Sequence, residues 1–331
     1  MYWYVKYPLI AILVCALLGL GLLIWRSVRK GGPAEEPPVV VLPEDSSNAP
    51  AGSAISSLPS GSTETAPAAA TPQPVSDSYA RLEEQLRQAE EQLNVGALEG
   101  ARRLATIAMQ LDGCVEFDKY WFRAFDIINA VNRRFMNGTA PCPEKKRHTV
   151  KSGDTLGRIA ANCFTSVNAL VRLNNLGDGN STILPHQVLS WLDGTWSIRV
   201  SKQHYVLILY FNNKPYRYYR VGIGREDRTP AGTFLISSRI AHPDWTPPGK
   251  HIPYGNPENV LGTHWLGLSP VGDTDPTLSG YGIHGTWEPD SIGKAASSGC
   301  VRMRNEDVEE LFDFIPEPGG TCPPVSVRIE E

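Results

Sequence analysis

The sequence predicts a multidomain protein: an N-terminal transmembrane helix, a disordered linker, an α-helical hairpin segment, a small βααβ module and a mostly-β C-terminal domain. Three observations predict this order. The chain opens with a long uncharged apolar run, continues with a stretch rich in proline, alanine, serine and threonine, and then changes its apolar period from three or four residues to two. The expected boundaries are 1–30, 31–77, 78–140, 147–192 and 196–331.

Length and charge limit the function classes. A chain of 331 residues is long enough for two or three domains, and its formal net charge of -4 leaves no basic stripe. Because nucleic-acid binding depends on positive charge facing phosphates, we expect no nucleic-acid partner.

Residues 9–25 carry no charge, and a bilayer core requires a helix of about 17–25 apolar residues. A cleaved signal peptide is the alternative, but no A-x-A-like site follows the run. A lipoprotein reading of Cys15 is poor, because Val14 stands where a small residue is expected. We expect an uncleaved anchor.

The charges around this run do not decide its orientation. The apolar run is followed by Arg26, Arg29 and Lys30 and preceded by Lys6. This bias by itself favours an orientation in which the domains after the run lie in the cytoplasm. Long domains translocate largely regardless of flanking charge, so we infer the orientation from the downstream domains.

Residues 31–77 contain scarcely any large apolar side chains, so ordering them would not offset the loss of conformational entropy. We expect a tether that, if largely extended, reaches ~100 Å or more.

Residues 78–140 place apolar side chains at spacings of three and four, which predicts amphipathic helices. The run 98–105 resembles the small-residue face of one tetratricopeptide-type hairpin. A packed helical spacer is the first interpretation of this segment, and a docking surface for an envelope protein is the second.

The next segment contains Ser152-Gly153-Asp154-Thr155-Leu156 and a Leu-Asn-Asn helix end, in the order strand, turn, capped helix, second helix, loop and strand. Over residues 148–191 it resembles the LysM module, which binds the glycan of peptidoglycan or chitin. The resemblance implies a carbohydrate groove near 153–156 and 180–184. Cys163-Phe164 departs from the usual aromatic-Gly pair, so that turn is expected to differ.

From Trp196 the apolar period is two, and Asn212-Asn213 separates two such runs as a hairpin turn does. Thr229-Pro230-Ala231-Gly232 forms another turn. We expect long loops between Ala241 and Gly282, a helix capped by Asn305, and a final strand with apolar positions at Val325, Val327 and Ile329.

The cysteine pairing stays open. Excluding Cys15 and Cys300, three complete pairings are possible among Cys114, Cys142, Cys163 and Cys322. Cys163 lies in an apolar helical pattern, which predicts a buried free thiol. Cys114 and Cys142 flank a helical segment and are a candidate disulfide in an oxidising compartment.

The strongest chemical signal is Cys300, which follows Gly299 and lies sixteen residues after His284. A cysteine nucleophile needs a nearby base or positive charge, and imidazole suits proton transfer near neutral pH. The amides of Gly299 and Cys300 are candidate oxyanion donors. Arg302 is a candidate partner for the thiolate or a substrate carboxylate, with an ordinary structural ion pair as the alternative.

Neither Cys-x-x-Cys nor His-Glu-x-x-His spacing occurs in the chain. We therefore expect neither a metal site nor a cofactor.

Several motifs in order make residues 197–330 resemble the YkuD-type L,D-transpeptidase catalytic domain: Lys202-Gln203, Thr229–Phe234, Asn259–Gly262, Ile283–Thr286 and Ser297–Met303. The resemblance implies a β-rich fold in which Cys300 attacks the carbonyl of the L-centre of the third residue in a peptidoglycan tetrapeptide stem. It also makes His284 the base and the Gly285 carbonyl the group that holds the imidazole tautomer. Many members have histidine where this chain has Ser298, so the proton transfer depends on His284 alone.

Two further residues are expected to contact substrate. Tyr254 lies in the loop that would cover the cleft, together with His242 and His251. His264 is expected to line the cleft, with a structural role as the alternative. The tryptophans of this region are expected to pack the loop rather than stack on sugars: Trp245, Trp265 and Trp287.

The combined prediction is a membrane-tethered L,D-transpeptidase whose catalytic domain lies in the periplasm or the extracytoplasmic wall space. Its expected partners are the glycan, the peptide stems and the membrane. D-Alanine leaves, and an amine of a stem or of a protein accepts the acyl group. The alternatives are an L,D-carboxypeptidase, in which water is the acceptor, and a non-catalytic scaffold that binds peptidoglycan through LysM.

Overall fold

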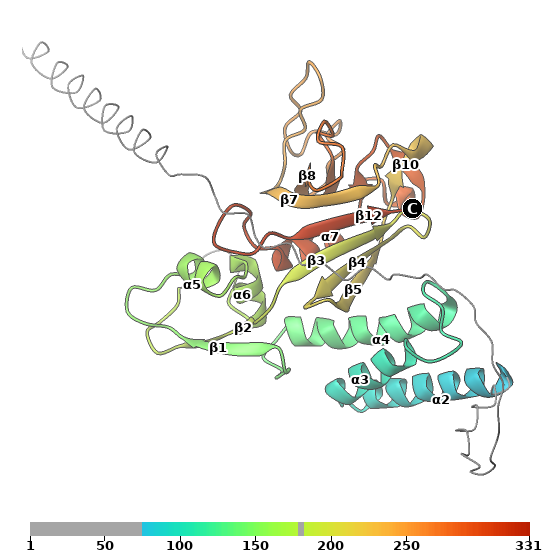
Figure 1. The fold of residues 1–331 in the computed structure, drawn as a ribbon. Coiled ribbons are helices and arrows are strands. Elements are labelled where there is room, and N and C mark those ends of the chain that lie inside the picture. The colour runs from blue at the N-terminus through green and yellow to red at the C-terminus, as the bar shows by residue number, and fades with distance from the viewer. Residues whose placement is uncertain (1–74, 178–181) are drawn as a thin grey trace, which may run out of the picture. The chain divides into compact units, whose positions relative to one another are not determined.

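The computed structural model describes residues 75–177 and 182–331, which all belong to one of the two units of the chain, Ala69–Glu331 (Figure 1). The predicted transmembrane segment at 9–25 and nearly all of the predicted linker at 31–77 lie outside the described residues. Within the described ranges, no helix combines the length and the apolar character that crossing a bilayer requires.

The described chain opens with helices α2 (Val75–Asn94), α3 (Leu98–Ala108) and α4 (Lys119–Met136). Helix α2 begins at Val75, so the last residues assigned to the linker are helical. Asp118 caps α4 by accepting the backbone N–H of Trp121 at 2.7 Å. Several of the apolar positions that predicted α2 and α3 are fully buried: Leu82, Leu86, Ala89, Ala101, Ala105 and Ala108.

Helix α4 packs against strand β5 (Lys214–Arg220) of the C-terminal domain. The buried Asn132 donates its Nδ2–H to the backbone carbonyl of Tyr216 at 2.7 Å. The hydroxyl of Tyr218 donates to the Asp126 carboxylate at 2.5 Å. These contacts favour the first interpretation of the helical segment, a spacer that packs on its own chain.

The small module has the predicted βααβ order, with β1 (Lys145–Thr149), α5 (Leu156–Asn162), α6 (Val167–Leu173) and β2 (Val188–Leu192). Strands β1 and β2 pair antiparallel, and the side chains of Thr155 and Ser166 cap the two helices. At the helix break, Phe164 has a φ of 53°, a left-handed conformation that glycine adopts more readily. The unusual Cys163-Phe164 pair therefore places a bulky residue in a strained position.

Asp313 joins this module to helix α7 (Asn305–Phe314) of the C-terminal domain. Its carboxylate accepts hydrogen bonds from Asn168 Nδ2 and Arg172 Nη1, both at 2.9 Å. Its backbone carbonyl accepts a hydrogen bond from Ser166 Oγ. Since these donors lie on α6 and at its cap, the second helix of the module is held directly against α7.

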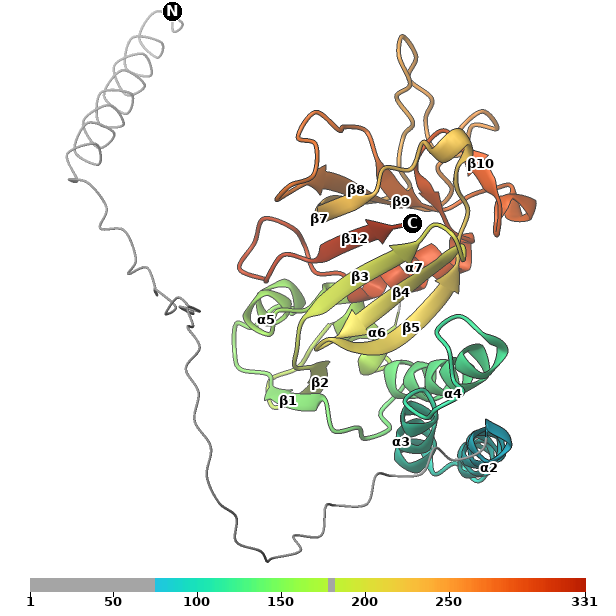
Figure 2. The ribbon, with the colours of Figure 1, turned by 45° about the vertical axis from the view of Figure 1, so that its right-hand side comes forward.

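The C-terminal domain is an eight-stranded sheet in the order β11-β9-β8-β7-β12-β3-β4-β5, with helix α7 against one face (Figure 2). Strand β12 pairs parallel with β3 and antiparallel with β7, so the last segment of the chain lies inside the sheet. The bounds besides β5 are β3 (Trp196–Ser201), β4 (Val206–Phe211), β7 (Gly232–Ala241), β8 (His264–Pro270), β9 (Gly282–His284), β11 (Val301–Arg302) and β12 (Ser326–Glu330).

Short elements surround one end of this sheet. Strands β6 (Ile223–Gly224) and β10 (Ala295–Ser297) form a separate parallel pair. Single 3-10 turns occur at Arg225–Asp227 and Pro289–Ser291.

The predicted hairpin turn is confirmed, because Asn212 and Asn213 adopt φ values of 49° and 60° between β4 and β5. The predicted final strand is also confirmed by β12, in which Val327 and Ile329 are buried, and Val325, directly before the strand, is buried as well.

Three details of the sequence interpretation are wrong. Strand β8 lies inside the region predicted as long loops, where pairing with β7 on one side and β9 on the other stabilises it. Asn305 is the first helical residue of α7 rather than its cap, and its Oδ1 instead accepts the N–H of Thr263 at 3.2 Å.

The third detail is the candidate disulfide: Cys114 and Cys142 are both free thiols, and burial raises the pKa of each to about 11. Cys163 is a buried free thiol, as predicted.

Candidate active site

Cys300 lies immediately before β11, the edge strand of the sheet, and His284 ends the neighbouring strand β9. The two strands run parallel, with Arg302 opposite His284. Because opposite residues of paired strands point to the same face, Arg302 and His284 share one face, and Cys300 directly precedes β11 at this edge of the sheet. Ordinary strand spacings put the Cα atoms of Cys300 and His284 about 8 Å apart, near enough for their side chains to approach.

The thiol of Cys300 is partly buried and rests against backbone groups. Its Sγ–H donates to the carbonyl oxygen of Gly280 at 3.8 Å. Burial raises the pKa of the Cys300 thiol, while the backbone of Gly282 and the charge of Arg302 lower it to a smaller extent. The resting thiol is therefore protonated at neutral pH.

His284 is 3% exposed, and its Nδ1 lies 2.6 Å from the carbonyl oxygen of Gly285. Because a carbonyl only accepts, Nδ1 carries the ring proton and Nε2 remains as the nitrogen that can accept one. Burial lowers the pKa of His284 to about 4, although the Gly285 carbonyl acts in the opposite direction. The resting pair therefore consists of a neutral thiol and a neutral imidazole.

Close packing holds the Gly285 carbonyl in place. The N–H of Gly285 donates to the carbonyl of His264 at 3.1 Å, and a Cβ on Gly285 would lie 2.2 Å from Asn305 Oδ1. A Cβ on Gly262 would lie 2.4 Å from the carbonyl carbon of Gly285. A larger side chain at either glycine would displace the group that sets the tautomer of His284.

The loop before Cys300 also requires glycine. Gly299 has a φ of 143°, and a Cβ there would lie 2.8 Å from the ring of Tyr281. The Gly299 N–H donates to Ser297 Oγ at 3.1 Å, and the same hydroxyl donates to the carbonyl of Cys300 at 2.7 Å. Of the two predicted oxyanion donors, the Gly299 amide is thus engaged within the loop, and the Cys300 amide is the remaining candidate.

Arg302 forms an ion pair from its Nη1 to Glu288 Oε2 at 2.8 Å, and its side chain is 13% exposed. Its charge also lowers the pKa of both Cys300 and His284. Arg302 therefore makes a structural ion pair, which was the alternative interpretation of this residue. It also supplies a positive charge that favours the thiolate form of Cys300.

Ser298 and Tyr254 are both more accessible than His284. The side chain of Ser298 is exposed. The ring of Tyr254 lies 4.5 Å from that of His242 and 6.4 Å from that of Trp287, which is 51% exposed. Tyr254 thus packs with His242 of the loop that was predicted to cover the cleft and with Trp287, which follows β9.

His264 faces away from the thiol. It precedes Trp265 in β8, and Trp265 lies opposite His284 with their rings stacked at 5.7 Å and 22°. Alternation therefore turns His264 to the other face, where its ring lies 4.4 Å from that of Phe312 in α7. The structure does not bring His264 together with Cys300, which favours the structural role that was its alternative.

Sequence reasoning did not identify three side chains of the site. Trp265 was expected only to pack the loop, Glu288 was not noticed, and Thr229 was read as part of a turn. Thr229 is 1% exposed, and its hydroxyl donates to the carbonyl of Gly299 at 2.8 Å. Trp265 and Thr229 stand in or beside segments that were singled out, but their contacts depend on a strand register that the sequence does not show.

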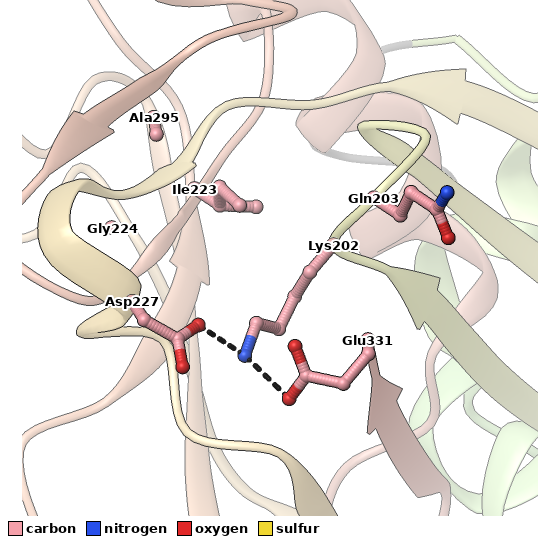
Figure 3. A pocket seen from close by; sticks show the side chains of 7 residues that line it. All are labelled: Lys202, Gln203, Ile223, Gly224, Asp227, Ala295 and Glu331. Atoms are coloured by element: carbon pink, nitrogen blue, oxygen red, sulfur yellow. Dashed lines mark hydrogen bonds and ion pairs between the residues drawn. The ribbon is translucent and has the colours of Figure 1, made fainter.

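A cavity of about 380 Å³ lies beside the strand pair β6 and β10 (Figure 3). Lys202, 4% exposed, reaches the carboxylates of Asp227 at 2.5 Å and Glu331 at 2.9 Å. Cys300 does not line this cavity, whose residues are Lys202, Gln203, Ile223, Gly224, Asp227, Ala295 and Glu331.

Comparisons with known proteins cover both the module and the sheet domain. Residues 195–327 match the YkuD family, described as the L,D-transpeptidase catalytic domain, and residues 148–191 match the LysM domain. The chain is similar to YkuD of Bacillus subtilis (strain 168), whose name places it among the L,D-transpeptidases. The two are 36% identical over 175 residues, and the match covers 51% of this chain and 93% of that protein. Similarity to YqjB of the same organism is 38% over 126 residues, 38% of this chain and 69% of the relative.

Among solved structures, the chain is similar to an L,D-transpeptidase from Mycobacterium tuberculosis H37Rv, and the superposition covers 56% of this chain and 90% of the mycobacterial chain. It is 13% identical with a TM-score of 0.33, which is too low to support an argument.

Proposed function

The chain belongs to the YkuD-type L,D-transpeptidase family and carries a LysM domain, and from this premise we propose that Cys300 performs acyl transfer on peptidoglycan stems with His284 as its base. One observation carries the proposal. Cys300 directly precedes β11, whose Arg302 lies opposite His284 on the adjacent parallel strand β9, and the Gly285 carbonyl accepts from Nδ1, which leaves Nε2 as the unprotonated nitrogen of the neutral ring.

In the first step, Nε2 of His284 takes the thiol proton while the sulfur of Cys300 bonds to the carbonyl carbon of the third residue in a tetrapeptide stem. The π electrons of that carbonyl move to its oxygen, where the backbone amide of Cys300 stabilises the negative charge. The C–N bond to D-alanine then breaks, and the leaving amine takes the proton from His284. The acyl group remains on Cys300 as a thioester.

In the second step, an amine of another stem attacks the thioester carbonyl. His284 accepts a proton from this amine and returns it to the sulfur as the C–S bond breaks. The enzyme is thereby restored and a new amide joins two stems. An amine on a protein would react in the same way, whereas water would leave a trimmed stem.

The neutral resting pair is compatible with this chemistry. Charge separates only as sulfur attacks, and the charge of Arg302 and the backbone of Gly282, which lower the pKa of Cys300, then stabilise the developing thiolate. Burial of the site strengthens both interactions.

The proposal includes the setting of the enzyme. The LysM module would bind the glycan, and the contacts of Asp313 with α6 would keep this module at a constant position beside the catalytic domain. The segment at 9–25 would anchor the chain, with the catalytic domain in the periplasm or wall space where peptidoglycan lies.

The test uses the full-length protein with tetrapeptide stems and identifies products by mass spectrometry. We expect cross-linked dimers from the wild type and none from Cys300→Ala or His284→Ala. Cys322→Ala is the matched control, because Cys322 is also a partly buried free thiol but lies in the segment between α7 and β12, beside a cavity that His284 does not line, and it should retain activity.

Other products would identify the alternatives. Trimmed stems alone indicate a carboxypeptidase, and unchanged stems indicate a binding scaffold. Dimers formed by Cys300→Ala would refute the assignment of the nucleophile.

A further inference from the structure

Thr229 is a buried threonine outside the chemistry described above, and it contacts the loop of the nucleophile. It lies after the 3-10 turn Arg225–Asp227 and is 1% exposed. Its hydroxyl accepts the backbone N–H of Gly224 at 2.7 Å and donates to the carbonyl oxygen of Gly299 at 2.8 Å. The oxygen accepts the N–H of Gly224 through a lone pair, so the hydroxyl's own hydrogen is directed at the carbonyl of Gly299.

The carbonyl of Gly299 and the N–H of Cys300 belong to one peptide unit. This unit is planar and trans, so the two groups point in opposite directions. Holding the carbonyl on Thr229 therefore also sets the direction of the Cys300 amide, which is the remaining candidate donor to the oxyanion.

Glycine makes such a restraint necessary. Gly299 has a φ of 143°, and glycine permits rotations of the adjoining peptide that other residues forbid. Ser297 Oγ accepts the N–H of Gly299, but this N–H belongs to the preceding peptide unit, between Ser298 and Gly299. The carbonyl of Gly299 has its hydrogen bond from Thr229, so this hydroxyl restrains the peptide that carries the catalytic amide.

We propose that Thr229 is a positioning residue that aims the Cys300 amide at the oxyanion formed during acyl transfer. This inference rests on the proposed function, since it assumes that Cys300 forms a tetrahedral adduct. Thr229 touches neither the thiol nor the substrate and acts through the peptide between Gly299 and Cys300.

The segment that carries Thr229 is itself held in place. Strand β6 pairs with β10, and a Cβ on Gly224 would lie 2.9 Å from the Cα of Gly299, so the two segments are in direct contact. On its other side, Asp227 forms the ion pair with the buried Lys202 (Figure 3). A restrained segment gives the hydroxyl a constant position from which to hold the loop.

The test compares two reactions of Cys300 in the full-length protein. Acylation by 4-nitrophenyl acetate passes through an oxyanion, whereas alkylation by iodoacetamide does not. Thr229→Val keeps the shape of the side chain and removes the hydroxyl, and Thr229→Ser keeps the hydroxyl. Rates measured with Cys300→Ala are subtracted in each case to remove reactions at other groups.

We expect Thr229→Val to slow acylation about tenfold or more, since removing an oxyanion donor altogether costs about 10²–10³-fold. Alkylation should change less than about twofold, because it uses the thiolate alone. Thr229→Ser should restore acylation to within about threefold of wild type, because the hydrogen bond is present again. Thr229→Ala should show the same selective loss and replaces Thr229→Val if the valine variant is unstable.

An equal loss in both reactions would overturn the inference, because it would mean that Thr229 only supports the loop. Unchanged acylation in the valine and alanine variants would overturn it as well. Both probes are small electrophiles that need no peptidoglycan recognition. A wild-type protein that acylates but leaves stems unchanged would therefore count against the proposed function alone.

Discussion

Lowering the pH should destabilise this fold through His284 in a way that a single substitution isolates. Burial lowers the pKa of His284 from 6.5 to about 4. Above pH 6.5 the imidazole is neutral in both the folded and the unfolded chain, so it does not affect stability there. Between pH 6.5 and 4 the unfolded chain binds a proton that the folded chain does not, and the free energy of unfolding falls.

The magnitude follows from the size of this pKa change. Each pH unit in that interval costs about 1.4 kcal/mol, so the whole interval costs about 3 kcal/mol. Below pH 4 both states carry the proton, and the effect stops growing. This loss is large compared with a typical unfolding free energy of about 5–15 kcal/mol.

The assay is urea denaturation at pH 7 and pH 4.5, followed by tryptophan fluorescence, for wild type and His284→Asn. The asparagine Nδ2–H stands close to the place of Nδ1–H and preserves a donor to the Gly285 carbonyl, but it does not titrate. Carboxylates elsewhere titrate in both proteins, so the difference between the two pH dependences isolates the imidazole. We expect the wild type to lose about 2–3 kcal/mol more than the variant over this interval.

The same pKa predicts the pH dependence of catalysis. Because His284 must be neutral to accept the thiol proton, kcat/KM should stay high down to about pH 5, with its acid limb near pH 4. Equal pH dependence of stability in the two proteins, together with an acid limb near pH 6.5, would refute the account of a buried neutral imidazole.

Three further predictions follow from particular contacts. Asp313→Ala removes the acceptor for Asn168 and Arg172 and should speed amide hydrogen exchange in α6 about tenfold or more, measured by mass spectrometry. Gly299→Ala should lower acyl transfer at least about 100-fold, measured as product formation from stems, because the added Cβ meets the ring of Tyr281 at 2.8 Å. Asp307→Asn should raise Tm at pH 7 but not at pH 4 in calorimetry. Burial and nearby acidic residues raise the pKa of Asp307 from 3.8 to about 6, so the free energy of unfolding falls as the pH rises from about 3.8 to 6 and stays lowered above pH 6.

Each of these has a clear contrary result. Unchanged exchange in α6 would show that Asp313 does not hold the module. A Gly299→Ala protein with near-normal activity would show that the loop accommodates a side chain. The same change in Tm at both pH values for Asp307→Asn would rule out titration as its cause.

The sequence located the site better than it described the surrounding fold. Cys300 and His284 carry chemistry that their neighbouring glycines made recognisable, and the motif resemblance added the carbonyl of Gly285. Strand β8 was missed because it contains a glycine and a terminal proline and is stabilised by pairing with distant segments on both sides. The sequence left two roles open for His264 for the same reason, since only the register of β8 shows which face its ring occupies.

The sequence by itself determined the order of the LysM module and the catalytic domain and the periods of their helices and strands, and it indicated Cys300 and His284 as the candidate nucleophile and base. These features are local, because composition, spacing and glycine positions act over a few residues. Only the tertiary structure decided that β9 and β11 lie side by side, that Thr229 holds the loop of Cys300, and that the thiol and imidazole rest uncharged. The physical reason is that strand pairing joins distant segments and that desolvation, which sets the protonation of buried groups, depends on everything packed around them.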